Sequence, residues 1–96
     1  MAKVEMYMKP WCGFCWRAKR LLKSKGVEYV EIDVSSDRRL EQVMIQRSGG
    51  GFTVPQIFID GVSIGGSDEL AAAERAGKLD DWLAGDGPNE EQEDVG

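Results

Sequence analysis

Two cysteines, Cys12 and Cys15, are the residues of this chain whose type and spacing indicate chemistry. They are the only cysteines among 96 residues, and two positions separate them. Thiols at this spacing can close a small disulfide across the first turn of a helix, where the helix N-terminus also stabilises a thiolate. A zinc site is the weaker alternative, because zinc usually takes four nitrogen or sulfur ligands and the chain has no histidine.

Basic residues dominate the part of the chain around this pair. Residues 1–25 contain seven Lys or Arg and a single acid, Glu5. Such an environment favours a thiolate and attracts anionic partners, and Lys9 lies only three positions before Cys12. The basic residues do not alternate with aromatic ones along a stripe, so we do not expect a nucleic-acid partner.

The length and composition predict one small domain without a membrane span. No apolar run approaches the roughly 20 residues that cross a bilayer, and the N-terminus lacks the apolar core of a secretion signal. We therefore expect a cytoplasmic protein, where cysteine pairs serve catalysis or metal binding and seldom form structural disulfides. Five of the 17 acids lie in residues 86–96, which explains the net charge of −5. We expect a folded domain over 1–85 and an acidic disordered tail over 86–96.

Hydrophobic periodicity predicts the elements that position the cysteines. Alternating or continuous apolar residues predict strands over 3–8, 29–34, 56–60 and 62–64. Helical spacing predicts a helix over 13–25 and a second one that Ser35 or Ser36 caps and that ends before the glycines at 49–51. A third helix is expected to have Ser67 as its N-cap, and a short fourth helix covers 79–83.

The order of these elements indicates an α/β fold. A strand–helix–strand unit makes the first two strands parallel, and Asp60-Gly61 predicts a hairpin between the last two. Together they give a four-stranded mixed sheet with helices on both faces, which is the smallest form of the thioredoxin-like fold. In that setting the spacing of Cys12 and Cys15 is typical of a redox motif.

Three motifs, in order, resemble the glutaredoxin family, and most closely its bacterial dithiol class. They are KPWCGFC at 9–15, TVP at 53–55 and IGGSD at 64–68. The resemblance runs from about Val4 to Leu83. It implies an enzyme, a glutathione-dependent thiol–disulfide oxidoreductase that reduces protein disulfides and glutathione mixed disulfides. It also implies a monomer whose partners are glutathione and disulfide-bonded or glutathionylated proteins.

The resemblance implies a role for each cysteine. Cys12 is the nucleophile, which takes glutathione from a mixed disulfide and releases the protein thiol. Cys15 is the resolving thiol, which can attack Cys12 and close an intramolecular disulfide. From the residues alone, Cys15 could also be a small residue of the core, and both can be true because the one-cysteine route of the family needs only the first cysteine.

The resemblance also implies a set of glutathione-binding residues. The backbone of Thr53 and Val54, before a cis Pro55, pairs with the cysteinyl part of glutathione. The resemblance places the γ-glutamyl carboxylate on the backbone at Ser67 and Asp68, after the turn at Gly66, and its ammonium on Asp68. It places the glycyl carboxylate on Lys9 and makes Phe14 an aromatic wall. The family often has a basic residue just before the TVP motif, but this chain has Phe52 there, so we expect Arg47 to help Lys9. From the residues alone, a trans proline at 55 fits equally well, and an ordinary helix cap at 66–68 is the weaker alternative.

Gly13 leaves a second function open, because many members of the family have proline at this position. Members with glycine there are associated with a 2Fe–2S cluster that two protomers share, each giving its first cysteine and a bound glutathione. The alternative is therefore a cluster-binding homodimer that carries or senses the cluster. Thioredoxin-like reduction without glutathione is a further competitor, but it leaves Lys9 and residues 66–68 without a role.

Overall fold

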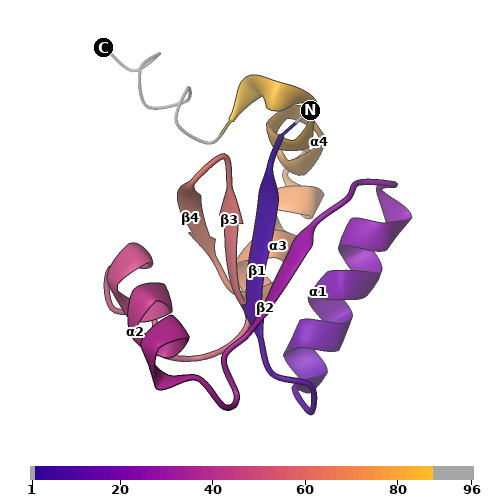
Figure 1. Cartoon of the computed structure of the whole chain (residues 1–96). Coiled ribbons are helices and arrows are strands. Elements are labelled where there is room, and N and C mark those ends of the chain that lie inside the picture. The colour runs from indigo at the N-terminus through magenta and orange to yellow at the C-terminus, as the bar shows by residue number, and fades with distance from the viewer. Residues whose placement is uncertain (1, 88–96) are drawn as a thin grey trace.

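A four-stranded mixed sheet forms the centre of the computed structural model, which describes residues 2–87 (Figure 1). The strands are β1 (Val4–Met8), β2 (Val30–Asp33), β3 (Gln56–Ile59) and β4 (Val62–Gly65), in the spatial order β2-β1-β3-β4. β1 runs parallel to β2 and antiparallel to β3, and β3 pairs antiparallel with β4. The predicted fold class is therefore confirmed. The tail expected over 86–96 lies outside the described residues from 88 onward.

Helices cover both faces of this sheet. They are α1 (Gly13–Ser24), α2 (Arg38–Arg47), α3 (Ser67–Arg75) and the short α4 (Leu79–Asp81), which a turn of π-helix, η1 (Trp82–Asp86), follows. α1 and α3 pack against one face and α2 against the other (Figure 1). None of the helices within 2–87 has the length and apolar character to cross a membrane.

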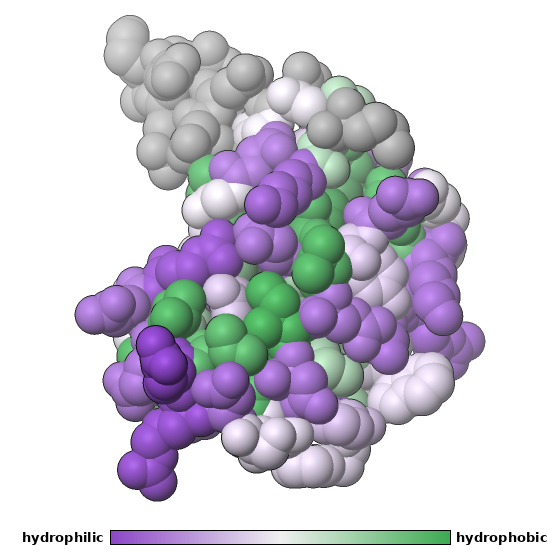
Figure 2. Space-filling model, viewed as in Figure 1, coloured by the Kyte–Doolittle hydropathy of each residue, from purple (hydrophilic) through white to green (hydrophobic). Residues whose placement is uncertain are grey.

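Alternation along β1 divides the core into two parts. Val4, Met6 and Met8 point to the face under α1 and α3, where they join Ile57, Ile59, Leu22 and Leu70. Tyr7 points to the opposite face and meets Phe58, Val34 and Met44. Figure 2 shows hydrophobic residues in the middle of the visible face, over the sheet, with hydrophilic residues over α2. Because successive side chains of β1 point to opposite faces of the sheet, the strand packs against helices on both sides.

The start of α2 differs from the prediction. Its N-cap is Asp37, whose Oδ1 accepts hydrogen bonds from the backbone N–H of Arg39 at 3.0 Å and of Leu40 at 3.1 Å. The expected caps at Ser35 and Ser36 are wrong, because the N–H of Ser35 instead donates to Oδ1 of Asp33 at 2.8 Å in a turn that precedes the helix. One carboxylate here caps two free N–H groups, as is usual at an N-cap.

Candidate active site

The N-cap of α1 is Cys12 itself. Its backbone is extended, with φ −87° and ψ 116°, and its Sγ accepts a hydrogen bond from the N–H of Cys15 at 3.1 Å. The first turn of α1 contains no acidic residue. The sulfur therefore lies where free N–H groups and the helix dipole stabilise negative charge.

Cys15 lies one turn further along, in a different environment. Its side chain is 1% exposed and belongs to the core between α1 and the sheet, whereas Cys12 is half-buried. Burial, together with the hydrogen bond with Cys12, raises the pKa of Cys15 to about 12. Cys15 is therefore a protonated thiol at neutral pH. Both cysteines are free, so the pair consists of an accessible sulfur and a buried reserve thiol.

A groove of about 400 Å³ lies beside Cys12. The Sγ of Cys12 is 3.6 Å from the carbonyl oxygen of Val54, which lines it. The other lining residues are Phe14, Thr53, Pro55, Gly66, Ser67, Asp68 and Glu69. The peptide bond between Val54 and Pro55 is cis, as the resemblance implied. The structure thus brings the second and third sequence motifs together next to the first one.

Two glycines allow α3 to begin against this loop. Gly65 has φ +103°, and a Cβ there would lie 2.8 Å from the Cγ of Glu69. A Cβ on Gly66 would lie 3.1 Å from the carbonyl oxygen of Pro55, which is tighter than nearly all real contacts. The two positions therefore need glycine for conformation and for close approach.

The N-terminus of α3 differs by one residue from the prediction. Gly66, and not Ser67, is the N-cap, and the Oε1 of Glu69 accepts the N–H of Gly66 at 2.7 Å. Sequence reasoning missed Glu69, although an acid three residues after a helix cap is a known capping signal. Ser67 is 6% exposed, and its Oγ has no hydrogen-bond partner among the described residues.

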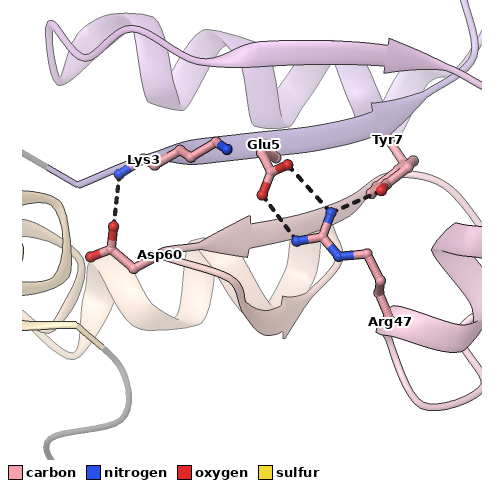
Figure 3. Close-up of polar contacts among 5 residues, drawn as sticks. All are labelled: Lys3, Glu5, Tyr7, Arg47 and Asp60. Atoms are coloured by element: carbon pink, nitrogen blue, oxygen red, sulfur yellow. Dashed lines mark hydrogen bonds and ion pairs between the residues drawn. The ribbon is translucent and has the colours of Figure 1, made fainter.

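Lys9 and Arg47 do not line the groove. The Nζ of Lys9 lies 3.9 Å from a carboxylate oxygen of Glu41, a long contact between partly exposed groups. Arg47 is engaged away from the groove, because its guanidinium contacts both carboxylate oxygens of Glu5 and the Tyr7 hydroxyl (Figure 3). It also lies 4.1 Å from the centre of the Phe58 ring. Arg47 therefore ties α2 to the sheet, and it lowers the pKa of Glu5 through hydrogen bonds and charge.

An ion pair joins α1 to the groove. The Nη2 of Arg17 contacts the Oδ1 of Asp68 at 3.1 Å. The two residues are 51 positions apart, so nothing in the local sequence pointed to this pair. It places a cation of α1 on an acid that lines the groove.

A second hollow, of about 500 Å³, lies among Ala2, Lys3, Val4, Gly26, Glu28, Tyr29 and Val30. None of its lining residues forms a recorded hydrogen bond with Cys12, whereas the Val54 carbonyl that lines the groove lies 3.6 Å from the Cys12 sulfur. Within residues 2–87, no group of three or more His, Cys, Asp or Glu side chains is arranged to hold a metal ion. The groove beside Cys12 is therefore the candidate active site.

The fold and the site define a class of protein, a thiol–disulfide oxidoreductase with a thioredoxin-like fold. A family model described as Glutaredoxin matches residues 4–64. The chain is 49% identical over 83 residues to "Glutaredoxin 3" of Escherichia coli, covering 86% of this chain and 99% of that one. It is 45% identical over 84 residues to "Glutaredoxin" of Pseudomonas aeruginosa, covering 88% and 99% of the two chains. The chain belongs to the glutaredoxin family.

Solved structures show the same likeness. A buckwheat glutaredoxin in complex with glutathione has a TM-score of 0.79 at 31% identity, with 86% of this chain and 77% of that chain covered. The solution structure of a glutaredoxin from Brucella melitensis has a TM-score of 0.75 at 49% identity, with 86% and 89% covered. The redox pair Cys12 and Cys15 thus belongs to a fold that these relatives share.

Proposed function

We propose that this protein reduces glutathione mixed disulfides and protein disulfides with glutathione as the electron donor, as a cytoplasmic monomer. The observation that carries the proposal is the groove beside Cys12, which joins the Thr53–Pro55 loop and the start of α3 to the sulfur. The buckwheat relative, a glutaredoxin–glutathione complex at 31% identity, supports glutathione as the ligand.

Each polar or charged part of glutathione has a candidate partner in or near the groove. The backbone of Thr53 and Val54 can pair with the cysteinyl residue as a short β-strand would. The free N–H groups at Ser67 and Asp68 suit the γ-glutamyl carboxylate. Asp68 suits its ammonium, and Phe14 forms a wall of the groove. Lys9 is proposed to take the glycyl carboxylate, because its contact with Glu41 is long and such exposed pairs are worth little.

The first reaction needs Cys12 only. Its thiolate attacks the glutathione sulfur of a mixed disulfide, the old S–S bond breaks, and the protein thiolate leaves and takes a proton. A second glutathione thiolate then attacks the glutathione sulfur held on Cys12. This step gives glutathione disulfide and restores the Cys12 thiolate, so that the net reaction converts the mixed disulfide and one free glutathione into the protein thiol and glutathione disulfide.

The second reaction uses Cys15 to reduce a protein disulfide. The Cys12 thiolate attacks one sulfur of the substrate disulfide, the substrate S–S bond breaks, and the other substrate sulfur leaves as a thiolate and takes a proton, which gives a mixed disulfide between Cys12 and the protein. Cys15 then loses its proton and attacks the Sγ of Cys12, which releases the second substrate thiol and closes the Cys12–Cys15 disulfide. Two glutathione molecules reduce that disulfide in turn. Burial raises the pKa of Cys15, so this route requires a step that removes the Cys15 proton, which the one-cysteine route does not need.

Steady-state turnover with a small glutathione mixed disulfide tests this function. The assay couples glutathione disulfide to glutathione reductase and compares the wild type with Cys12→Ser and Cys15→Ser. We expect activity in the wild type and in Cys15→Ser and none in Cys12→Ser. An inactive wild type, or an active Cys12→Ser, contradicts the proposal.

A further inference from the structure

The ion pair between Arg17 and Asp68 adds a cation to one end of the groove. The Nη2 of Arg17 lies 3.1 Å from the Oδ1 of Asp68, and both side chains are largely exposed, at 52% and 78%. Two acids line the groove, Asp68 and Glu69, and of these Asp68 forms an ion pair within residues 2–87. The Oδ2 of Asp68 has no recorded hydrogen bond or ion pair there.

The charges at the start of α3 explain why a cation is needed there. Two acids, Asp68 and Glu69, occupy the first turn and line the groove. Glu69 already accepts the N–H of Gly66 at 2.7 Å. A ligand carboxylate that approaches the N–H groups of Ser67 and Asp68 therefore meets two negative side chains. Without a nearby cation, their repulsion offsets much of the attraction of the helix N-terminus, which is worth only about 0.3–1 kcal/mol at an exposed site.

Ser67 provides a second, independent sign that a ligand belongs at this end. It lines the groove and is 6% exposed, yet its Oγ has no hydrogen-bond partner among the described residues. Buried hydroxyl groups in proteins nearly always have a partner. A polar ligand at the start of α3 would supply one after a rotation of the hydroxyl side chain.

We propose that Arg17 contacts the α-carboxylate of the γ-glutamyl group and makes this end of the groove selective for a zwitterion. Its guanidinium has five N–H donors, so it can hold Asp68 and a ligand carboxylate together. Asp68 keeps Oδ2 for the ligand ammonium. The proposal rests on glutathione as the ligand and adds a specificity-determining residue from α1, outside the sequence motifs.

The test uses three mixed disulfides of mercaptoethanol and the full-length protein. One contains glutathione, one contains its analogue without the α-carboxylate, and one contains its analogue without the α-amino group. kcat/KM is measured for the wild type, Arg17→Met and Arg17→Lys. Arg20→Met is the matched control, because Arg20 is an exposed residue of the same helix and its loss changes the net charge equally.

We expect Arg17→Met to lower kcat/KM for the glutathione substrate about five-fold through KM, the range of an exposed charge pair. Arg17→Lys restores part of the loss, and Arg20→Met changes little. With the analogue that lacks the carboxylate, Arg17→Met and the wild type react equally. With the analogue that lacks the amino group, Arg17→Met still loses activity. The equal rates on the first analogue show that the variant is folded.

Three results overturn the proposal. An unchanged kcat/KM of Arg17→Met with the glutathione substrate means that Arg17 does not contribute to binding. A higher value means that Arg17 competes with the ligand for Asp68. An equal loss on the analogue without the carboxylate means that Arg17 only positions Asp68. Failure of the proposed function looks different, because the wild type then has no turnover with any of the three substrates.

Discussion

The backbone N–H of Cys15 donates a hydrogen bond to the Sγ of Cys12 at 3.1 Å. The donor belongs to the backbone, so it remains when the Cys15 side chain is replaced. The Cys15 sulfur itself is buried, and its pKa is raised to about 12. Cys15 thus donates its backbone N–H to the Cys12 sulfur, while its own thiol stays buried and protonated.

The first prediction concerns selective alkylation of the reduced protein. We expect iodoacetamide at neutral pH to modify Cys12 and spare Cys15, because Cys12 is accessible at the start of α1 whereas Cys15 is buried and its pKa is raised to about 12. Cys15→Ser should be alkylated at a rate close to that of the wild type, since the backbone donor remains. Peptide mapping by mass spectrometry measures both sites. Labelling of Cys15 before Cys12 would contradict this account.

The second prediction concerns stability at alkaline pH. In the unfolded chain, Cys15 loses its proton near its ordinary value of 9.0, whereas the native protein holds it to about 12. Between these values the unfolded chain binds fewer protons, so the free energy of unfolding falls as pH rises. The contribution of Cys15 is complete below pH 9.0 and is lost by about pH 12.

Urea denaturation of the reduced protein at several alkaline pH values measures this loss. Burial also raises the pKa of Tyr29, which adds to the slope with the same sign, so the comparison must be made with Cys15→Ala. We expect the wild type to lose stability more steeply than this variant, by at most about 1.4 kcal/mol per pH unit. Parallel slopes would show that Cys15 titrates normally in the native protein.

The sequence predicted the sheet and its helices because their patterns are local. Alternating apolar residues mark β1 in the sequence. Gly26, which has φ +71°, marks the end of α1. Helix caps were less certain, because Asp37 competes with Ser35 and Ser36 over three adjacent positions and only the turn geometry decides between them.

In the candidate site, residues in local motifs could be predicted from the sequence, whereas contacts between distant segments could not. Apart from Glu69, the groove residues are in motifs and were found, although their role in binding remains a prediction. Two contacts depend on packing between distant segments: Arg17 with Asp68, and Arg47 with Glu5, 42 positions away. Arg47 was expected near the glycyl carboxylate because the chain lacks the family's basic residue before the TVP motif, whereas in the structure its guanidinium contacts Glu5 and Tyr7 of the sheet.

The third prediction concerns this tie between α2 and the sheet. The side chain of Glu5 is only 15% exposed, so removal of Arg47 leaves a half-buried carboxylate unpaired. We expect Arg47→Leu to reduce the free energy of unfolding by about 1–3 kcal/mol. Arg39→Leu, an exposed residue of the same helix, should change it by less than about 0.5 kcal/mol.

A double-mutant cycle separates the pair from the packing around it. Glu5→Gln removes the charge that Arg47 leaves behind, so the double variant should be more stable than the sum of the two single losses predicts. Urea denaturation at neutral pH gives the three values. Simple additivity would show that the two residues act independently.

The fourth prediction concerns Gly13, the first residue of α1. No heavy atom lies within 4 Å of a Cβ placed there, and Cys12 has ψ 116°, close to the extended range that precedes a proline. A proline also needs no N–H at this position. We expect Gly13→Pro to raise the free energy of unfolding by about 0.4–1 kcal/mol, seen as a higher Tm. A lower Tm would contradict this reading of the helix start.

The same variant tests the cluster alternative, which stays a prediction. If glycine at 13 permits a 2Fe–2S cluster, anaerobic reconstitution with iron, sulfide and glutathione should give visible absorbance and a dimer in the wild type. Gly13→Pro should give less of both. A colourless wild-type monomer after reconstitution removes this alternative.

The central claim is that Cys12 receives the glutathione. The most direct measurement is mass spectrometry of Cys15→Ser after one turnover with a glutathione mixed disulfide and no free glutathione. The account predicts one glutathione per protein molecule, mapped to Cys12 and removed when glutathione is added. A protein that stays unmodified under these conditions, or a glutathione that stays on Cys12 when glutathione is added, would contradict it.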